Sequence, residues 1–320
     1  MTAGRTRVAV VGTGYLGRLH ARVLTEMPEV EHVGFLEPRD EVAAEVQQAL
    51  GLKRWTSLDE LAKAIDGAVV ATTTDAHAET AAALMERGVD VMIEKPITST
   101  VDQGQRLVAL AREKKRVLQV GHVERYNPAI VAAIPFVGHP RYVEADRLGV
   151  FTGRSLDIDV LLDLMIHDLQ LVIAFLGDDV SAVHAVGIPV LTPNVDMANV
   201  RIEFGSGAVA NLTASRVSSE RVRKFRLFGS DAYVSVDTKE QQVRGYRLGK
   251  DANGAPAVTP LDVTVEKKEP LRAELEAFVG AIRGRERPLV SGEDGLAALR
   301  LANRVAEEID ASLARWKGER

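Results

Sequence analysis

The 320-residue chain contains no cysteine, which excludes disulfides, cysteine-ligated zinc and thiolate nucleophiles. No apolar run reaches the roughly 20 residues of a membrane-spanning helix. The amino-terminal segment MTAGRTRVAVVG is too short in apolar residues for a signal peptide. Positive charge is not in excess either, because the formal net charge is -5. We therefore expect a cytoplasmic protein that binds neither a membrane nor nucleic acid.

Short apolar strands alternate with amphipathic helices over residues 1–122. Hydrophobic residues make up 46% of the chain, enough for two ordinary domains. Strand–helix alternation at this spacing predicts an α/β domain with a doubly wound parallel sheet, a Rossmann fold. The expected strands are RVAVVG (7–12), EHVGFLE (31–37), GAVVAT (67–72), VDVMIE (89–94) and RVLQVG (116–121).

The pattern changes over residues 123–320, where several apolar runs alternate with period two. FGSGA (204–208) predicts an antiparallel hairpin, and one long helix is expected over 159–177. These features predict an α+β domain for substrate binding and oligomerisation, with an open, mostly antiparallel sheet and helices on one face. Two closing helices, 271–284 and 294–313, are long enough to pack back on the first domain. Residues 247–262 are expected to form a mobile loop.

The segment GTGYLG contains the pattern Gly12-x-Gly14-x-x-Gly17 between a predicted strand and a helix. An acidic residue, Glu37, follows at the end of the next strand, which is the context that a dinucleotide-binding turn requires. The alternative is a glycine-rich turn with no ligand. Glu37 favours NAD because it binds ribose hydroxyls, while Arg39 could accept the extra phosphate of NADP. The expected cofactor contacts here are Gly12, Thr13, Gly14, Tyr15, Leu16, Gly17, Glu37 and Arg39.

Two further segments carry candidate chemistry. Asp163 and His167 are four residues apart in an otherwise apolar helix, so their side chains can reach each other. The alternatives are a satisfied core histidine and ordinary surface aspartates at 163 and 168. No third ligand stands at a recognisable spacing, so no metal site is expected. EKPIT (94–98) ends a buried strand on two opposite charges, a pattern that a solvated turn also shows.

These motifs together resemble the Gfo/Idh/MocA family of nicotinamide-dependent sugar and polyol oxidoreductases. The resemblance rests on GTGYLGRLHA, VVATTTDAHAE, EKP, VGHVERYNPA and the later Asp-x-x-x-His helix, in this order. It implies that Lys95 reaches the nicotinamide pocket and that Asp163 and His167 supply the general acid and base. The sequence departs from the family at Thr73, where the family often has proline, and at Gln170, where it often has aspartate. Further cofactor contacts implied by the resemblance are Thr72, Thr73, His77, Glu94, Lys95 and His122.

Within the family, the motifs are most similar to members that oxidise the 3-hydroxyl of UDP-N-acetylglucosamine, toward 3-amino sugars of lipid A or another surface glycan. Arg125 and Tyr126 follow the last strand of the first domain, where ligands collect, so both are expected substrate contacts with Lys95, Asp163 and His167. A dehydrogenase of a free sugar or inositol is the alternative, and a non-catalytic dinucleotide sensor is a weaker one. We expect a homodimer or homotetramer. Arginines available for a diphosphate, or simply solvated, are Arg125, Arg147, Arg154, Arg216, Arg221 and Arg223.

Overall fold

The computed structural model describes residues 4–151 and 159–316, and it divides into two compact units. The first unit contains residues up to Val123 together with Glu269–Leu299. The second contains Glu124–Lys268 and the chain from Arg300 onward. Among the described helices, none is long and apolar enough to cross a membrane.

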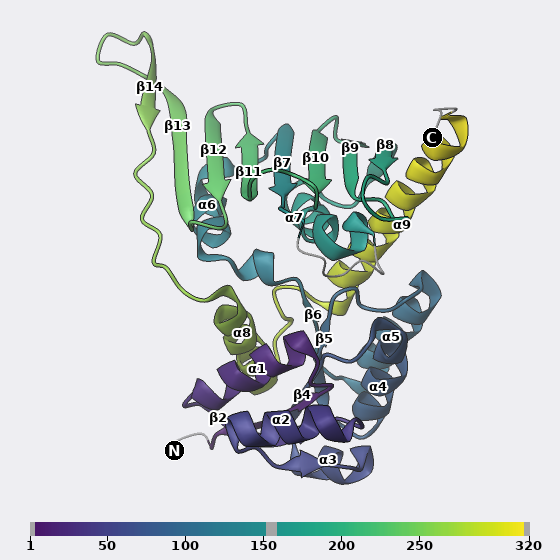
Figure 1. Cartoon of the computed structure of the whole chain (residues 1–320). Helices are drawn as coiled ribbons and strands as arrows, with labels where there is room; N and C mark the ends of the chain where they lie inside the picture. The colour runs from purple at the N-terminus through teal and green to yellow at the C-terminus, as the bar shows by residue number, and fades with distance from the viewer. Residues whose placement is uncertain (1–3, 152–158, 317–320) are drawn as a thin grey trace. The chain divides into compact units, whose positions relative to one another are not determined.

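The first unit is built on a six-stranded parallel sheet with the order β3-β2-β1-β4-β5-β6 (Figure 1). This confirms the predicted doubly wound fold, because the strand order reverses between β1 and β4. The central strands β4 and β5 are apolar between their ends, as strands covered on both faces must be. They are β1 (Thr6–Val11), β2 (Val30–Leu36), β3 (Arg54–Trp55), β4 (Gly67–Val70), β5 (Asp90–Glu94) and β6 (Leu118–Gly121).

Helices follow the strands of this sheet and bury their apolar faces on it. The sequence pattern missed α2 and β3, because α2 is polar over most of its surface and β3 has only two residues. Helix α8 belongs to this unit, and its Leu275, Phe278 and Val279 join the core beside Val10 and Met92. The helices are α1 (Tyr15–Glu26), α2 (Asp40–Leu50), α3 (Leu58–Ala64), α4 (Thr74–Glu86), α5 (Val101–Lys114) and α8 (Pro270–Gly284); α9 (Gly292–Arg315) begins here.

The second unit is built on an eight-stranded sheet with the order β14-β13-β12-β11-β7-β10-β9-β8. Only β7 and β10 pair in parallel, so the predicted mostly antiparallel sheet is confirmed, as is the β9–β10 hairpin. The strands are β7 (Tyr142–Leu148), β8 (Val180–Ile188), β9 (Met197–Phe204), β10 (Val209–Ser215), β11 (Val222–Phe228), β12 (Ala232–Asp237), β13 (Gln242–Lys250) and β14 (Pro256–Pro260).

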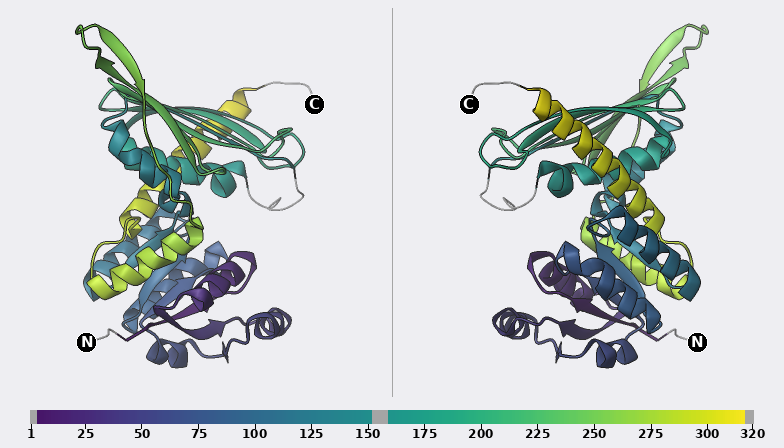
Figure 2. Two further views of the ribbon diagram at one scale, coloured as in Figure 1. Left: turned by 90° about the vertical axis from the view of Figure 1, so that its left-hand side faces the viewer. Right: turned by 90° about the vertical axis from the view of Figure 1, so that its right-hand side faces the viewer.

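Helices cover one face of this sheet, as Figure 2 shows, and the side chains on that face are apolar. Every second side chain of β9 is buried, which is the pattern of a strand with one covered face. Helices α6 (Pro128–Val137), α7 (Ile166–Leu176) and the last part of α9 supply the other half of the core. The opposite face is polar and hydrogen-bonded: Arg226 contacts Glu144 and Asp146, at 2.8 and 2.9 Å.

One expectation for the second unit was wrong. Residues 247–262 do not form one long loop, because most of them belong to β13 and β14, which pair with each other. The glycines and prolines that suggested a loop lie at the turn around Asp251–Gly254 and at an edge strand, where proline is tolerated. The helix predicted over 159–177 is present, although its first turn, Leu161–Met165, is π-helical and the regular helix α7 follows it.

The turn between β1 and α1 depends on two glycines. Gly12 has φ +85°, and a Cβ at this residue would lie 2.7 Å from the carbonyl oxygen of Ala71. A Cβ at Gly17 would overlap the carbonyl oxygen of Gly12. Gly14, by contrast, precedes α1 and has open space around the position of a Cβ. Gly12 and Gly17 therefore let the turn and the helix pack closely, whereas Gly14 leaves room at the start of the helix.

The two classes of glycine predict different effects of an added methyl group. Gly17→Ala should destabilise the cofactor-free protein by about 1–3 kcal/mol, because the methyl group must displace backbone atoms. Gly14→Ala is the matched control and should leave the free energy of unfolding within about 0.5 kcal/mol. Urea denaturation without cofactor measures both. Equal stability of the two variants would contradict this account of the turn.

Candidate active site

The carboxyl ends of the parallel strands gather most of the residues expected to hold the cofactor. Gly12 follows β1, Glu37 follows β2, Thr72 follows β4, Glu94 ends β5 and His122 follows β6. In open parallel sheets, ligands bind at this edge near the point where strand order reverses. The open space at Gly14 and the amino-terminal end of α1 suit a pyrophosphate, because backbone N–H groups and the partial positive charge of a helix gather there. These residues therefore fit a dinucleotide.

Glu37 is buried and tied to both the glycine turn and Arg39. Its carboxylate accepts hydrogen bonds from the Thr13 backbone N–H at 2.9 Å and from Arg39 Nε at 2.8 Å. Burial alone would raise the pKa of Glu37, but the hydrogen bonds from Arg39 and Thr13 outweigh it and lower the pKa to about 2. Glu37 is therefore ionised at neutral pH, and it holds the Arg39 guanidinium beside it.

The Glu94 carboxylate is held on two sides behind Lys95. His20 Nε2 lies 2.6 Å from Glu94 Oε1, and the backbone N–H of Lys95 donates to Oε2 at 3.1 Å. Lys95 itself is partly exposed, and its bond to Pro96 is cis. His20 lies within the segment GTGYLGRLHA, but no role was predicted for it. A signal was available: His20 lies on the apolar face of α1, four residues before Leu24.

Two other histidines at this edge are buried. The ring nitrogens of His77 lie 2.9 Å from the carbonyl oxygen of Pro96 and 3.3 Å from that of Thr72, so His77 joins the segments after β4 and β5. Burial lowers the pKa of His77. Burial and, after it, the charge of Lys95 lower the pKa of His122 to about 3. His122 is therefore neutral and a poor general base near neutral pH.

In the second unit, Asp163 and His167 lie on and just after the π-helical turn. Both are partly exposed, whereas Met165, Ile166 and Asp168 around them are buried. Single π turns inside helices often occur at functional sites. No proline or glycine lies in Leu161–Met165, so this turn has no signal in the amino-acid sequence.

Asp168, next to His167, forms a buried ion pair with Arg147 of β7. Two hydrogen bonds of 2.7 Å join the guanidinium to the carboxylate, and a third of 2.7 Å joins it to Glu124. Burial raises the pKa of Asp168, although Arg147 opposes the shift. The pair fixes the helix next to His167, so Asp168 is not an ordinary surface residue. Arg147 is bonded inside the protein to Asp168 and Glu124. The expectation that Arg147 could bind a diphosphate was therefore wrong.

The remaining arginines considered for phosphate binding differ in their surroundings. Arg125 is partly exposed in the 3₁₀ turn Val123–Tyr126, while Tyr126 is buried. Arg216 is buried with its Nε 3.7 Å from Asp196 Oδ1. Arg221 and Arg223 line a hollow of about 460 Å³ on the second unit, and Arg223 donates to the carbonyl oxygen of Leu148 at 2.6 Å. Arg154 lies outside the described residues.

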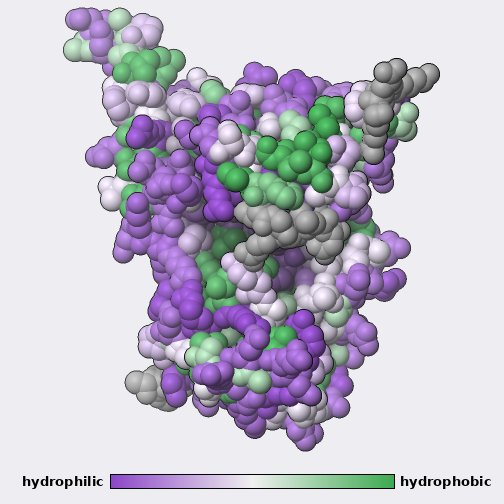
Figure 3. Space-filling model, viewed as in Figure 1, coloured by the Kyte–Doolittle hydropathy of each residue, from purple (hydrophilic) through white to green (hydrophobic). Residues whose placement is uncertain are grey.

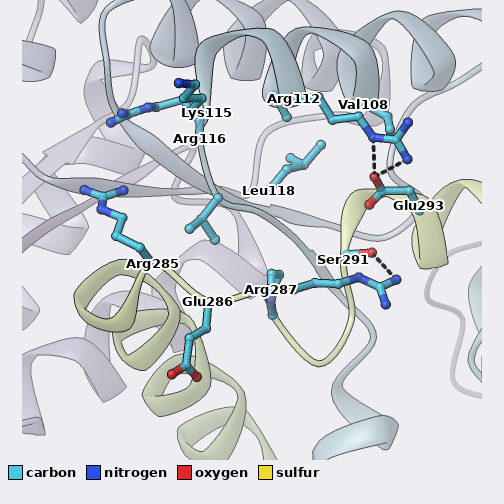
Figure 4. A pocket seen from close by; sticks show the side chains of 13 residues that line it. Val108, Arg112, Lys115, Arg116, Leu118, Arg285, Glu286, Arg287, Ser291 and Glu293 are labelled. Carbon is cyan, nitrogen blue, oxygen red and sulfur yellow. Dashed lines mark hydrogen bonds and ion pairs between the residues drawn. The ribbon is translucent and has the colours of Figure 1, made fainter.

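A separate hollow of about 540 Å³ lies at the opposite, amino-terminal edge of the parallel sheet (Figure 4). It is lined by cations, but its arginines are engaged by neighbouring groups. Arg112 is bonded to Glu293, Arg285 to the buried Asp90, and Arg287 to Asp294. Because these three arginines already have partners, we assign this hollow no ligand. Within the described residues, no group of three His, Asp or Glu side chains could hold a metal ion.

Comparison with known proteins identifies the family. Residues 6–122 match the oxidoreductase family with an NAD-binding Rossmann fold, and residues 137–235 match the Gfo/Idh/MocA carboxyl-terminal domain. The chain belongs to the Gfo/Idh/MocA oxidoreductase family. The predicted family, the oxidoreductase class and the NAD cofactor are therefore confirmed.

Several relatives match this chain over nearly its whole length. It is 38% identical over 312 residues to the UDP-N-acetylglucosamine 3-dehydrogenase of Acidithiobacillus ferrooxidans, covering 97% of this chain and 99% of the relative. A crystal structure of that enzyme superposes with a TM-score of 0.89, at 36% identity and the same two coverages. The scyllo-inositol 2-dehydrogenase (NAD(+)) of Bacillus subtilis is 25% identical, over 91% of this chain and 90% of its own.

The position of Glu37 predicts that the protein prefers NADH to NADPH. An ionised carboxylate after β2 accepts hydrogen bonds from ribose hydroxyls and repels a 2′-phosphate. Arg39, which is mainly exposed, would favour the phosphate, but Glu37 already holds its guanidinium. Glu37→Gln should therefore weaken NADH binding and reduce the ratio by which the protein prefers NADH to NADPH. Dissociation constants of both cofactors measure the effect, with Arg39→Gln as the matched control. Tighter NADPH binding to the unchanged protein would contradict this prediction.

Proposed function

We propose that this protein uses NAD to oxidise the 3-hydroxyl of UDP-N-acetylglucosamine to a ketone. The observation that carries the proposal is the full-length relationship to an enzyme of that activity, at 38% identity. Inositol dehydrogenases are the more distant relatives, at 24–25% identity. The product ketone would be the substrate of an aminotransferase, which leads to a 3-amino sugar of lipid A or another surface glycan.

Removing a hydride from a secondary alcohol also requires removing its hydroxyl proton. We assign His167 as the general base, because it is partly exposed and imidazole titrates near neutral pH. Asp163 orients the imidazole ring and stabilises its protonated form. Lys95 stabilises the negative charge that develops on the substrate oxygen. NAD, when bound, accepts the hydride.

The other histidines near the expected cofactor edge suit this role less well. His77 is buried between two carbonyl oxygens, and the pKa of His122 is about 3. Tyr126 is buried. The buried Arg147–Asp168 pair supports the assignment of His167, because it fixes the helix one residue further along. A positioned acid or base needs such support.

Substitution of the assigned residues should reduce turnover. His167→Asn and Lys95→Met should each lower kcat by roughly 10²–10⁴-fold, the usual effect of removing a positioned base or a charge stabiliser. NADH binding should survive the histidine change, because His167 lies in the second unit. Fluorescence titration with NADH is the control for folding. A rate within a few-fold of the unchanged protein in His167→Asn would contradict the assignment.

The substrate class predicts a clear ranking among candidate alcohols. A nucleoside diphosphate favours arginine, whose guanidinium grips phosphate through two hydrogen bonds, and Arg125 is the arginine we assign to it. NADH formation should be measured with UDP-N-acetylglucosamine, UDP-glucose, glucose and myo-inositol, in the presence of a carbonyl trap that removes the ketone. Only the UDP-sugars should react. Turnover of inositol or glucose without any UDP-sugar would contradict the proposed substrate.

We also propose that the second unit assembles into a homodimer or homotetramer. Apolar side chains form patches on an otherwise mainly polar surface (Figure 3). On β8 and the turn that follows it, four apolar residues are 44–60% exposed, more than a monomer needs. They are Val186, Ile188, Val190 and Leu191.

A further inference from the structure

Helix α8 of the first unit contains a buried acidic residue that the proposed reaction does not use. Glu274 of α8 is fully buried, and neither of its carboxyl oxygens has a hydrogen-bond partner among the described residues. Its backbone carbonyl accepts a hydrogen bond from the Gln119 side chain of β6 at 3.0 Å. An ionised carboxylate without partners is costly in such a place, so a buried acid of this kind takes up a proton instead.

Glu274 lies close enough to Glu94 for the two carboxyl groups to affect each other. Burial and, after it, the negative charge of Glu94 raise the pKa of Glu274 well above its ordinary value. Burial would also raise the pKa of Glu94, but the hydrogen bond and charge of His20, and the charge of Lys95, lower it. Two buried carboxyl groups that are close together cannot both ionise cheaply, and only Glu94 has cationic neighbours. Glu94 therefore carries the negative charge and Glu274 carries the proton.

The other titratable groups around Glu94 come from five segments. His20 lies on α1, His77 on α4, Lys95 follows β5, His122 follows β6 and Glu274 lies on α8. Of these, only Lys95 and His20 lower the pKa of Glu94, since His122 is neutral and Glu274 is uncharged. The position of Glu94 is also set by size. A Cβ at Gly121 would lie 3.0 Å from Glu94 Oε2, so the carboxylate occupies space that only glycine leaves open.

We propose that His20, Glu94 and Glu274 form one positioning unit for Lys95, in which ionised Glu94 holds the Lys95 backbone and neutral Glu274 keeps the cluster at a single negative carboxylate. The inference rests on the proposed role of Lys95. Glu94 and Glu274 are positioning residues, because they act through Lys95. Glu94 reaches Lys95 through its backbone N–H, so the direction of the carboxylate determines where the chain leaves β5.

The simpler interpretation is that the cluster only attaches α1 and α8 to the sheet. An apolar side chain would serve that purpose at lower cost, because burying a carboxyl without hydrogen bonds destabilises the fold. Polar side chains from α1, β5 and α8 instead lie near the end of β5, directly before Lys95. The two interpretations differ in what a substitution changes: attachment affects stability and cofactor binding, whereas positioning affects turnover.

The protonation of Glu274 can be tested without any turnover. At pH 7, the infrared spectrum of the unchanged protein should contain the carbonyl band of a protonated carboxylic acid that Glu274→Gln lacks. Glu276→Gln, on the same helix but partly exposed, is the matched control and should keep the band. Glu274→Gln should also remove a loss of stability at rising pH. The folded protein holds this proton at a pH where the unfolded chain has released it, so stability falls between the two pKa values. An unchanged band in Glu274→Gln would overturn this part of the inference.

The positioning role is tested by separating turnover from cofactor binding. Glu94→Gln keeps the size of the side chain but removes its negative charge and replaces one acceptor oxygen by a donor, so the side chain can no longer accept from both His20 and the Lys95 N–H. We expect kcat to fall roughly 10–100-fold, the effect of a small misplacement of a catalytic group, with the dissociation constant of NADH changed less than threefold. His20→Asn should act in the same direction, and it keeps the test valid if Glu94→Gln does not fold. Glu276→Gln should leave kcat within twofold.

Each result has a distinct meaning. An unchanged kcat in Glu94→Gln and His20→Asn, with reduced stability, would show attachment alone and overturn the inference. A parallel loss of kcat and NADH binding would make Glu94 a cofactor contact instead and would also overturn it. Failure of the proposed function appears elsewhere, in Lys95→Met and His167→Asn, and the infrared result does not depend on it.

Discussion

The close packing of α1 against the end of β1 is the constraint on which the first unit depends. It is possible only because Gly17 has no side chain to meet the carbonyl oxygen of Gly12. Once α1 lies there, its turn presents the Thr13 N–H to Glu37, and its inner face presents His20 to Glu94. One glycine contact therefore places the partners of two buried carboxylates at opposite ends of the expected cofactor edge.

The second unit solves a related problem with a buried ion pair. Asp168 and Arg147 satisfy each other through two hydrogen bonds, and Glu124 takes a third. Buried charges are tolerated only when they are paired in this way, and removing one partner typically costs several kcal/mol. The pair joins β7, α7 and the turn at Val123–Tyr126, and it lies directly beside His167. In both units, a paired carboxylate is the sequence neighbour of a residue to which we assign chemistry.

The edge residues of the first unit also differ in how they use charge. Glu37 is ionised because Arg39 and Thr13 compensate its burial, Glu94 because His20 and Lys95 do so, and Glu274 is neutral because nothing does. The same side chain thus takes two protonation states within one unit, according to its neighbours. The histidines follow the same rule, since burial keeps His77 and His122 neutral. Of the histidines considered, His167 is the one that is only partly buried, which is the reason for assigning it as the base.

Local patterns in the sequence were enough for the parallel sheet, the glycine turn, the β9–β10 hairpin and the family, because each depends on periodicity or on residues close together in the chain. The β13–β14 hairpin was misjudged, since its turn residues resemble a loop and its pairing is decided by a neighbouring strand. The π turn at Leu161–Met165 and the pairs Arg147–Asp168 and His20–Glu94 could not be seen. Arg147 and Asp168 are 21 positions apart in the chain, and His20 and Glu94 are 74 positions apart. Burial and protonation depend on such distant neighbours, so they were decided by tertiary structure alone.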